Sequence, residues 1–584
     1  MRRLHPRTGL LTLGLLSLLV TAAPARAQEE DVRSAAKARL AELEQGIDGW
    51  DLVSARKALT ELEKLVPEGS EALVYYQGRM AFEEGRYAEA AELLAKAGVE
   101  DKPSSYLRLA KDTATITKRH NKVESEHFIF LYPSGKEEVL VPYALETLEA
   151  IYRAMQEDLG WTPPGGKVRV EVVNNARELS KISTLSYEQI QTTGTIAMCK
   201  FNKLMVTSPK AVARGYDWQD TLAHEYVHLV ISQASRNNVP IWLHEGMAKF
   251  LESRWRGQGG LGLNPSALAL LGRRMKANTL VPFEKMHPSI AMLPTAEDAA
   301  LAFAEVFYVV DYVLATKGSA GLRTIIQELR NGRTDKQAVE AAVGMPFGLF
   351  EKAWLAHIKK QPFPKELLPR EQVVLKEDAK GQDKDDAKKG REISFGDFAE
   401  VQEIPARKLA HLGELLRERN RIKAAAAEYS KAYAMVGDKY ESISNKYALT
   451  LLELRRLDEA EAVLRGSLRV YPGLPGTNVH LGRILLFRKD WLKAKVAYME
   501  ALSTNPFDPE VHIALTKIHH ELGETALKER TVKAGALLTG LTEPGVENAA
   551  WKFMRDPKEL SGANTPETPA GGAPDAGTPK DGGK

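Results

Sequence analysis

The chain has 584 residues, which is too long for a single compact core and indicates several domains. Its 44% hydrophobic, 27% charged and 7% aromatic residues are typical of folded proteins and exclude collagen-like and wholly disordered chains. The formal net charge is +3 and no basic block stands out in the folded part, so the sequence lacks the electrostatic footprint of a nucleic-acid-binding protein. The single cysteine, Cys199, excludes an intramolecular disulfide framework and any cysteine-based zinc finger.

The first 27 residues have the pattern of a secretory signal peptide. Met1–Arg7 is basic, Gly9–Ala23 is apolar, and Ala25-Arg26-Ala27 is a small-x-small cleavage site. An uncleaved membrane anchor is the alternative, but about 15 apolar residues fall short of the roughly 20 that span a bilayer. We therefore expect cleavage after Ala27, export to the periplasm or the medium, and no membrane span in the mature chain.

Small residues recur at intervals of 34–35 residues in the C-terminal part, residues 401–540, as at Gly413, Ala448 and Gly482. The pattern resembles the tetratricopeptide repeat, a helix–turn–helix unit with small residues where its two helices touch. Residues 28–118 have a weaker version of the pattern around Gly78 and Ala90. The resemblance implies all-α solenoid segments on both sides of a central domain, and a protein partner for the repeats. We expect the N-terminal pair to pack on the central domain, because two such units alone bury little surface.

Two further segments have the composition of linkers. Residues 366–400 include Lys376–Arg391, where 11 of 16 residues are charged and the signs are mixed, which is typical of a solvated linker. A tail that binds a partner is the alternative. Residues 541–584 end in a run rich in Gly, Pro, Ala and Thr, for which we expect disorder.

The central domain, residues 119–365, mixes strand and helix periods. Strand patterns come first and helical patterns follow, which favours an α+β fold. The expected elements are strands at 127–132 and 168–172, a helix at 140–159, a hairpin of 195–198 with 204–207, and helices from there to Phe350.

The chemistry is concentrated in a helix predicted to begin near Asp217. It contains His224-Glu225-Tyr226-Val227-His228. Residues four apart share one helix face, so both imidazoles can reach one zinc ion, and Glu225 lies beside that ion as a general base. The alternative is a surface helix with two solvated histidines.

A second predicted helix supplies a third ligand. Glu245 follows His228 after sixteen residues, and two histidines with a glutamate leave the open fourth position that a catalytic zinc requires. His244 and Glu252 remain alternative ligands. The extended metzincin motif is excluded, because it would need Gly at 231 and His at 234, where the chain has Ile231 and Ala234.

His224–His228 with the later Trp-Leu-x-Glu-Gly-x-Ala segment, 242–248, resembles the gluzincins of the peptidase MA clan. The similarity is greatest to bacterial peptidase MA-like domain proteins, which often carry tetratricopeptide repeats. It implies a gluzincin-type metallopeptidase core, with Zn²⁺ held by His224, His228 and Glu245 and with Glu225 as the base. Gluzincin aminopeptidases hold the substrate amine with a Gly-x-Met-Glu-Asn loop. The nearest stretch here, 194–199, lacks that glutamate, which favours internal cleavage.

Other roles have weaker signals. Tyr308 and Tyr312, four apart on an expected helix, are candidates for the oxyanion stabiliser, as is His287, although tyrosines on an apolar helix are more often core residues. A thermolysin-like Glu-x-x-x-Asp is absent because position 249 is Lys249, so the sequence does not identify the residue that would hydrogen-bond the far side of a histidine ligand. Residues 195–198 are a candidate edge strand for pairing with an extended substrate.

Two functions follow as hypotheses. The first is an exported zinc endopeptidase whose repeats recruit a substrate or another protein partner. The alternative is a binding scaffold in which the repeats matter most and the metallopeptidase-like core is inactive or structural.

Overall fold

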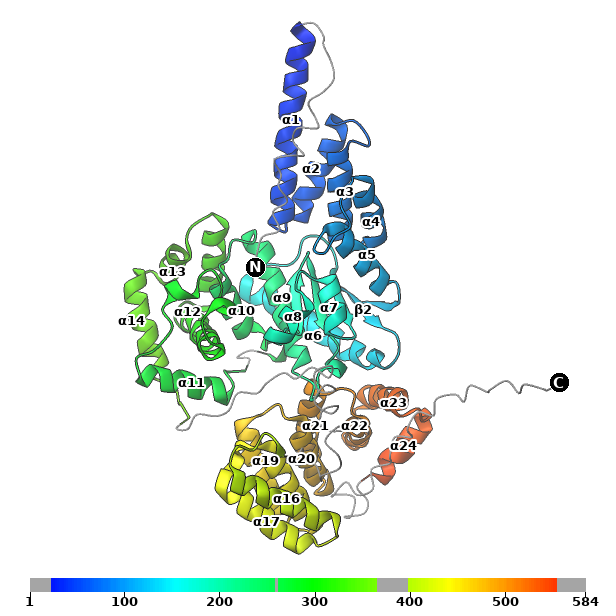
Figure 1. Cartoon of the computed structure of the whole chain (residues 1–584), viewed down its shortest axis with the longest axis vertical. Helices are drawn as coiled ribbons and strands as arrows, with labels where there is room; N and C mark the ends of the chain where they lie inside the picture. The colour runs from blue at the N-terminus through cyan, green and yellow to red at the C-terminus, as the bar shows by residue number, and fades with distance from the viewer. Residues whose placement is uncertain (1–22, 258–260, 365–397, 554–584) are drawn as a thin grey trace, which may run out of the picture. The chain divides into compact units, whose positions relative to one another are not determined.

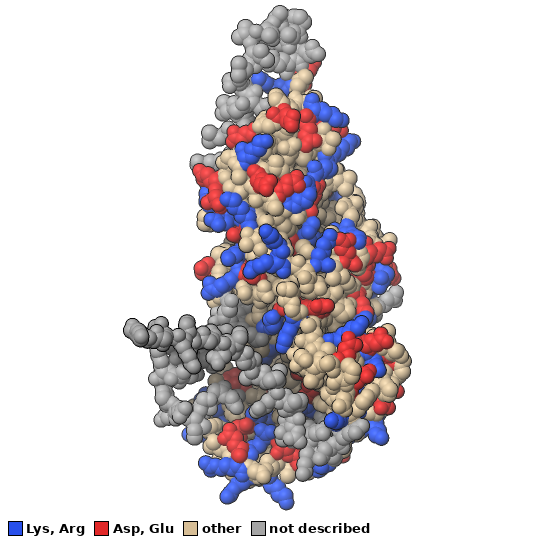
Figure 2. Space-filling view, turned by 90° about the vertical axis from the view of Figure 1, so that its right-hand side faces the viewer, with Lys and Arg blue, Asp and Glu red and all other residues tan. Residues whose placement is uncertain are grey.

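A computed structural model describes residues 23–257, 261–364 and 398–553. The described chain is mostly helical, with one five-stranded sheet. It divides into two compact units (Figure 1): one holds the described residues up to 364 together with Ser503–Asn505, and the other holds 398–502 and 506–553. Lys and Arg side chains are interspersed with Asp and Glu over the face shown in Figure 2, as expected for a chain of small net charge.

The first unit begins with five helices. α1 packs on α2, α3 on α4 and α4 on α5, and the apolar faces of the first three helices bury a cluster that includes Leu43, Leu59 and Met80. Asp51 starts α2 because its carboxylate accepts the N–H of Ser54 at 3.1 Å. α1 begins at Ala23 and so includes the end of the expected signal peptide, whose first 22 residues lie outside the described residues. The helices are α1 (Ala23–Asp48), α2 (Leu52–Leu65), α3 (Glu71–Glu83), α4 (Tyr87–Lys96) and α5 (Tyr106–Thr117).

The sheet has the strand order β1-β2-β3-β5-β4. β2, β3 and β5 are parallel neighbours and are buried, whereas β1 and β4 pair antiparallel at the two edges. The sequence did not predict β1, because its polar residues are largely exposed and give no apolar alternation. The strands are β1 (His120–Glu124), β2 (Phe128–Pro133), β3 (Val168–Val173), β4 (Ala197–Lys200) and β5 (Lys203–Thr207).

Helices connect the strands and then complete the unit. α6 joins β2 to β3 and ends at Gly160, whose positive φ of 66° suits a residue without a Cβ. α6 and α9 pack on each other, and α10 packs on both α9 and α12. The helices are α6 (Leu140–Leu159), α7 (Ala176–Ile182), α8 (Tyr187–Thr193), α9 (Trp218–Ser235), α10 (Ile241–Leu251), α11 (Pro265–Lys276), α12 (Ala296–Arg330), α13 (Asp335–Val343) and α14 (Phe347–Ile358).

α12 breaks at Gly318, where φ is 61° and ψ is −166°. Among the described residues it is the one helix long and apolar enough to cross a membrane, so length and composition do not by themselves exclude a span in the mature chain, contrary to our expectation. Most of its apolar window is buried inside the protein, however, as in the core helix of a soluble domain.

The N-terminal helices clamp the turn between β4 and β5. The Phe201 ring meets the ring of Phe82 edge-on at 5.2 Å and that of Tyr106 at 6.0 Å. Beside them lies Lys203, whose side chain is 2% exposed. Its ammonium is 2.7 Å from the carboxylate of Glu171 and donates to the Tyr87 hydroxyl. The ion pair itself links β5 to β3, whereas the hydrogen bond to Tyr87 and the ring contacts of Phe201 join the N-terminal helices to the sheet.

The second unit is a run of antiparallel helix pairs. Its small residues are required where paired helices touch, since a Cβ on Gly413 would come within 3.0 Å of the Tyr429 ring, and one on Gly482 within 2.6 Å of the Tyr498 ring. The helices are α16 (Ile404–Glu418), α17 (Ile422–Val436), α18 (Glu441–Glu453), α19 (Leu457–Val470), α20 (Pro475–Phe487), α21 (Trp491–Thr504), α22 (Pro509–Glu521), α23 (Thr525–Thr539) and α24 (Glu543–Lys552).

α24 falls in the range 541–584 that we expected to be disordered. Val546 and Ala550 are fully buried against α22 and α23, so the folded unit extends to about residue 553 and the predicted start of the tail was too early. The rest of that range, and all but residues 398–400 of the expected linker, lie outside the described residues.

Candidate metal centre

Two helices carry the candidate site. α9 is almost entirely buried and ends at Arg236 in the left-handed conformation, with φ of 55°. The chain then turns, and α10 starts after Pro240. α10 lies close against α12 because Gly246 has no side chain: a Cβ there would stand 2.9 Å from the carbonyl oxygen of Val306. This close approach sets the position of Glu245, the preceding residue.

The three predicted ligands converge. Nε2 of His224 lies 3.0 Å from Nε2 of His228, and Oε2 of Glu245 lies 3.7 Å from the first nitrogen and 3.5 Å from the second. Donor atoms at about 2.0–2.1 Å from a tetrahedral zinc are about 3.3 Å apart. The three distances therefore fit one ion without rearrangement of the backbone, and the same three residues form a group able to hold a metal.

The three side chains of the cluster are partly exposed to solvent. The side chains of His224, His228 and Glu245 are 20%, 14% and 23% exposed, although the helix around them is buried. A structural zinc site is closed by a fourth protein ligand, whereas a catalytic one leaves a position for water. The partial exposure of all three donors favours the catalytic kind.

Glu225 lies beside the cluster and is only 7% exposed. Burial raises the pKa of its carboxyl group, while the two histidines and the backbone N–H of Cys199, which donates to it, lower the pKa in part. Cys199 belongs to the edge strand β4, so this hydrogen bond ties the carboxylate to the sheet. Burial is also the main reason why the pKa of the Cys199 thiol lies well above its usual value, which leaves the thiol without nucleophilic character.

Glu252 supplies the partner of His224 that the sequence did not identify. Its Oε2 lies 2.9 Å from Nδ1 of His224, on the opposite side of the ring from the cluster, and its other oxygen accepts from Lys249. Glu252 is therefore placed behind a ligand rather than among the ligands. Burial lowers the pKa of His224, but the hydrogen bonds to Glu245 and Glu252 outweigh it and raise the pKa to about 10.

His244, the other alternative ligand, also lies behind the cluster. Its Nδ1 is 2.5 Å from Nδ1 of His228, and its Nε2 is 3.1 Å from the hydroxyl of Ser232. Both ring nitrogens are thus engaged away from the point where the three ligands meet. The ring is 8% exposed, and burial, followed by the charge of His228, lowers its pKa to about 3.

Comparison with known proteins identifies two kinds of domain in the chain. A family model described as the peptidase MA superfamily matches residues 149–360. These residues are a peptidase MA domain. A tetratricopeptide-repeat model matches residues 52–105 and 411–475, so the resemblance to peptidase MA-like proteins with such repeats is confirmed.

None of the curated proteins matches the chain. Among solved structures, the "Crystal structure of APC/C hetero-tetramer Cut9-Hcn1" is similar at a TM-score of 0.26 and 11% identity, over 89% of this chain and 84% of that one.

The two tyrosines that were candidates for the oxyanion role, Tyr308 and Tyr312, lie where α12 packs against α14. The ring of Tyr308 meets that of His357 at 6.4 Å, and Tyr312 contacts His357 at 5.6 Å and Phe350 at 5.6 Å. The structure does not bring either tyrosine into the cluster. His287, the third oxyanion candidate, pairs instead with Asp335 at 3.0 Å. The oxyanion role of these residues stays a prediction, to which the geometry adds no support.

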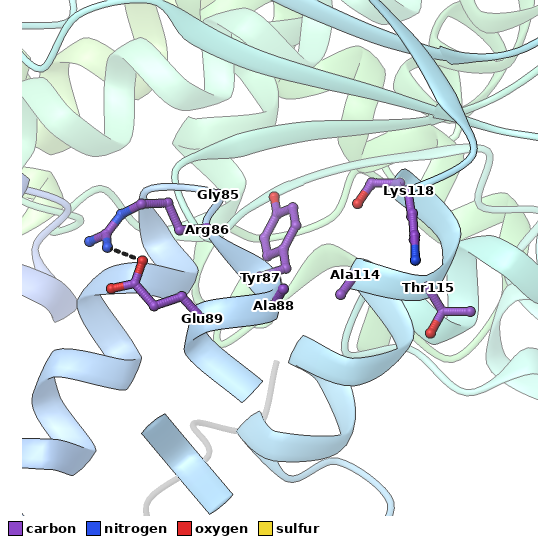
Figure 3. Close-up of a pocket in the computed structure, with 9 residues that line it drawn as sticks. Gly85, Arg86, Tyr87, Ala88, Glu89, Ala114, Thr115 and Lys118 are labelled. Atoms are coloured by element: carbon purple, nitrogen blue, oxygen red, sulfur yellow. Dashed lines mark hydrogen bonds and ion pairs between the residues drawn. The ribbon is translucent and has the colours of Figure 1, made fainter. Parts of the chain in front are cut away.

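A hollow of about 550 Å³ lies at the N-terminal helices, away from the cluster. Figure 3 shows the ion pair of Arg86 with Glu89 at one side of it and Lys118 at the other. Its lining contains no histidine or cysteine and no unpaired acid, so it offers none of the groups that hydrolysis needs.

Proposed function

We propose that the protein is an exported zinc-dependent metalloendopeptidase with a gluzincin-type core. The observation that carries the proposal is the convergence of Nε2 of His224, Nε2 of His228 and Oε2 of Glu245 at 3.0–3.7 Å, with the buried carboxylate of Glu225 beside them. The donor set fits zinc, because imidazole nitrogens and a carboxylate oxygen are among its usual ligands.

Zinc in such a site lowers the pKa of a bound water and polarises a carbonyl group. The residues of the chain supply the rest. His224 and His228 present Nε2 to the same point, and Glu252 and His244 hold the far sides of the two rings. Glu225 takes a proton from the attacking water and returns one to the leaving amine, which suits a carboxyl whose pKa is raised by burial.

Internal cleavage is favoured by the edge strand. β4 is the last strand of the sheet, paired only through β5 among the described residues, and Cys199 N–H on it contacts the proposed base. An extended peptide added along this edge would pass the cluster with its chain continuing in both directions. The stretch before β4 also lacks the glutamate that holds a free amine in the aminopeptidases.

The repeats supply the second half of the proposal. The C-terminal repeats recruit a protein substrate or partner, as is usual for stacked helical repeats with an extended surface. The signal-peptide pattern of residues 1–27 supports export to the periplasm or the medium. The alternative function, a binding scaffold with an inactive core, is supported by the same repeats and by the lack of an assigned oxyanion stabiliser.

Hydrolysis by matched variants separates the two functions. The zinc-supplemented full chain is incubated with an unfolded protein such as casein, beside Glu225→Gln and, as a control, Glu149→Gln, a carboxylate outside the cluster. We expect cleavage by the full chain and the control and none by Glu225→Gln. Equal cleavage by Glu225→Gln would contradict the assigned base, and no cleavage by any chain over a panel of unfolded proteins, with partner binding intact, would favour the scaffold.

A further inference from the structure

The far sides of the two histidine ligands are held differently. Behind His224 stands a carboxylate, Glu252, which can only accept a hydrogen bond. Behind His228 stands another imidazole, that of His244, which can either donate or accept. The direction of this second contact is therefore not fixed by the residue type, and it decides which nitrogen of His228 carries a proton.

The contact allows two arrangements when both rings are neutral. In the first, Nδ1–H of His228 donates to Nδ1 of His244, Nε2–H of His244 donates to the Ser232 hydroxyl, and Nε2 of His228 has a free lone pair. In the second, every proton is reversed: Ser232 donates to His244, His244 donates to His228, and Nε2 of His228 carries hydrogen. Only the first arrangement leaves a nitrogen able to bind a metal ion.

We infer that His244, closed by Ser232, is a positioning residue that selects the metal-binding tautomer of His228. The inference rests on the proposed zinc site and extends it. The three residues form a chain of hydrogen bonds that leaves α9 at His228, passes through α10 at His244 and returns to α9 one turn later at Ser232. The geometry holds both rings in place, with contacts of 2.5 and 3.1 Å, so the chain aligns His228 as well as setting its proton.

Ser232 has a definite part in the selection. With its hydroxyl present as acceptor, the buried Nε2–H of His244 has a partner in the metal-binding arrangement. Without it, that arrangement leaves a buried donor unpaired, whereas the reversed one leaves only a bare acceptor. Loss of the hydroxyl therefore shifts the balance toward the arrangement that cannot bind a metal.

Zinc affinity of the full chain, measured by competition with a chromophoric chelator, tests the inference. We compare the full chain with His244→Phe, which keeps a ring but offers no acceptor, and His244→Asn, whose amide oxygen can take the place of Nδ1. Outer partners of metal ligands typically contribute 10- to 100-fold in affinity. We expect a loss of that size in His244→Phe and recovery to within about threefold of the unaltered chain in His244→Asn.

Ser232→Ala and Ser235→Ala complete the set. Both serines are buried on α9, but only Ser232 contacts His244, so we expect a loss of a few-fold to about tenfold in the first and none in the second. Unfolding temperatures of the metal-free variants identify any variant that fails to fold. If His244→Phe fails to fold, the zinc affinities of Ser232→Ala and His244→Asn test the inference in its place.

Each outcome is decisive. Zinc bound equally well by His244→Phe and the unaltered chain would overturn the inference and leave the zinc site standing. Equal losses in His244→Phe and His244→Asn would also overturn it, because the ring rather than the acceptor would then matter. Failure of the unaltered chain to bind zinc would overturn both the inference and the proposed function.

Discussion

Glu305 gives the chain a pH-dependent stability that one substitution should remove. The residue lies on α12, next to the Val306 carbonyl that packs against Gly246, and its side chain is 0% exposed. Oε1 accepts the N–H of Val281 at 2.8 Å, while Oε2 is buried with no hydrogen-bond partner among the described residues. Burial raises the pKa of this carboxyl group from 4.5 to about 8, against smaller opposing effects of Val281 and Arg274.

The sign of the effect follows from proton binding. The folded chain keeps the Glu305 proton up to about pH 8, whereas the unfolded chain releases it near 4.5. Since the folded state binds more protons between these values, the free energy of unfolding falls as the pH rises from about 4.5 to 8 and changes little above that through this group. Between pH 5 and pH 8 the fall amounts to about 3–4 kcal/mol, because each pKa unit corresponds to about 1.4 kcal/mol.

Glu305→Gln tests this value. The amide cannot ionise and still accepts from Val281, so the stability of the variant relative to the unaltered chain should improve by about 3–4 kcal/mol between pH 5 and pH 8. Urea unfolding at several pH values, followed by tryptophan fluorescence, measures the difference, and Glu297→Gln at the exposed start of α12 is the control. An identical pH dependence in the unaltered chain and Glu305→Gln would refute the reasoning.

Three further substitutions probe what holds the candidate site. Gly246→Ala must move α10 away from α12, because the added Cβ would stand 2.9 Å from the Val306 carbonyl oxygen. We expect the free energy of unfolding in urea to fall by about 1–3 kcal/mol and zinc to bind more weakly. A fully retained zinc affinity would contradict the close-packing argument. Phe201→Ala removes the side chain of a residue that is 4% exposed and whose ring packs on Phe82. Its free energy of unfolding in urea should be about 3–5 kcal/mol lower than that of the unaltered chain. A difference under about 1 kcal/mol would mean that the N-terminal helices do not hold the β4–β5 turn rigidly. Glu252→Gln weakens the hydrogen bond to Nδ1 of His224 and should lower zinc affinity about 10- to 100-fold in a chelator competition. Unchanged affinity would mean that this carboxylate does not contribute to metal binding.

The arrangement of the candidate ligands could be predicted from the sequence because it depends on local geometry. Residues four apart on a helix share a face whatever the rest of the fold does, so the convergence of His224 and His228 follows from the chain alone. Glu245 needed one assumption about tertiary structure, that α10 folds back on α9, and the motif around it supplied that assumption.

The roles of Glu252 and His244 could not be predicted in the same way. Glu252 lies two turns after Glu245, at the C-terminal cap of α10, so spacing shows that it is near the site but not which side of His224 it approaches. His244 directly precedes Glu245, so spacing alone also placed it near the site and left it as an alternative ligand. Only the packing of α10 against α9 determines that Glu252 contacts Nδ1 of His224 and that His244 contacts Nδ1 of His228, on the sides of the two rings that face away from the cluster.

The environment of residues outside the motif was harder to predict where charged side chains are buried by tertiary packing. Lys203 and Glu171 are charged residues in strands, yet both are buried as a pair under the N-terminal helices, a tertiary arrangement with no local signal. For Tyr308 and Tyr312 the local pattern was informative. Their position on an apolar helix predicts core residues, and their ring contacts with α14 agree with that prediction.

The central claim, that His224, His228 and Glu245 bind one catalytic zinc ion, is tested most directly by the metal content of the purified full chain. Elemental analysis after zinc loading and dialysis should give one zinc per chain, with none retained by His224→Ala and one retained by Glu225→Gln, because Glu225 is the base and not a ligand. An unaltered chain that keeps no zinc, or a His224→Ala variant that keeps it fully, would contradict the account.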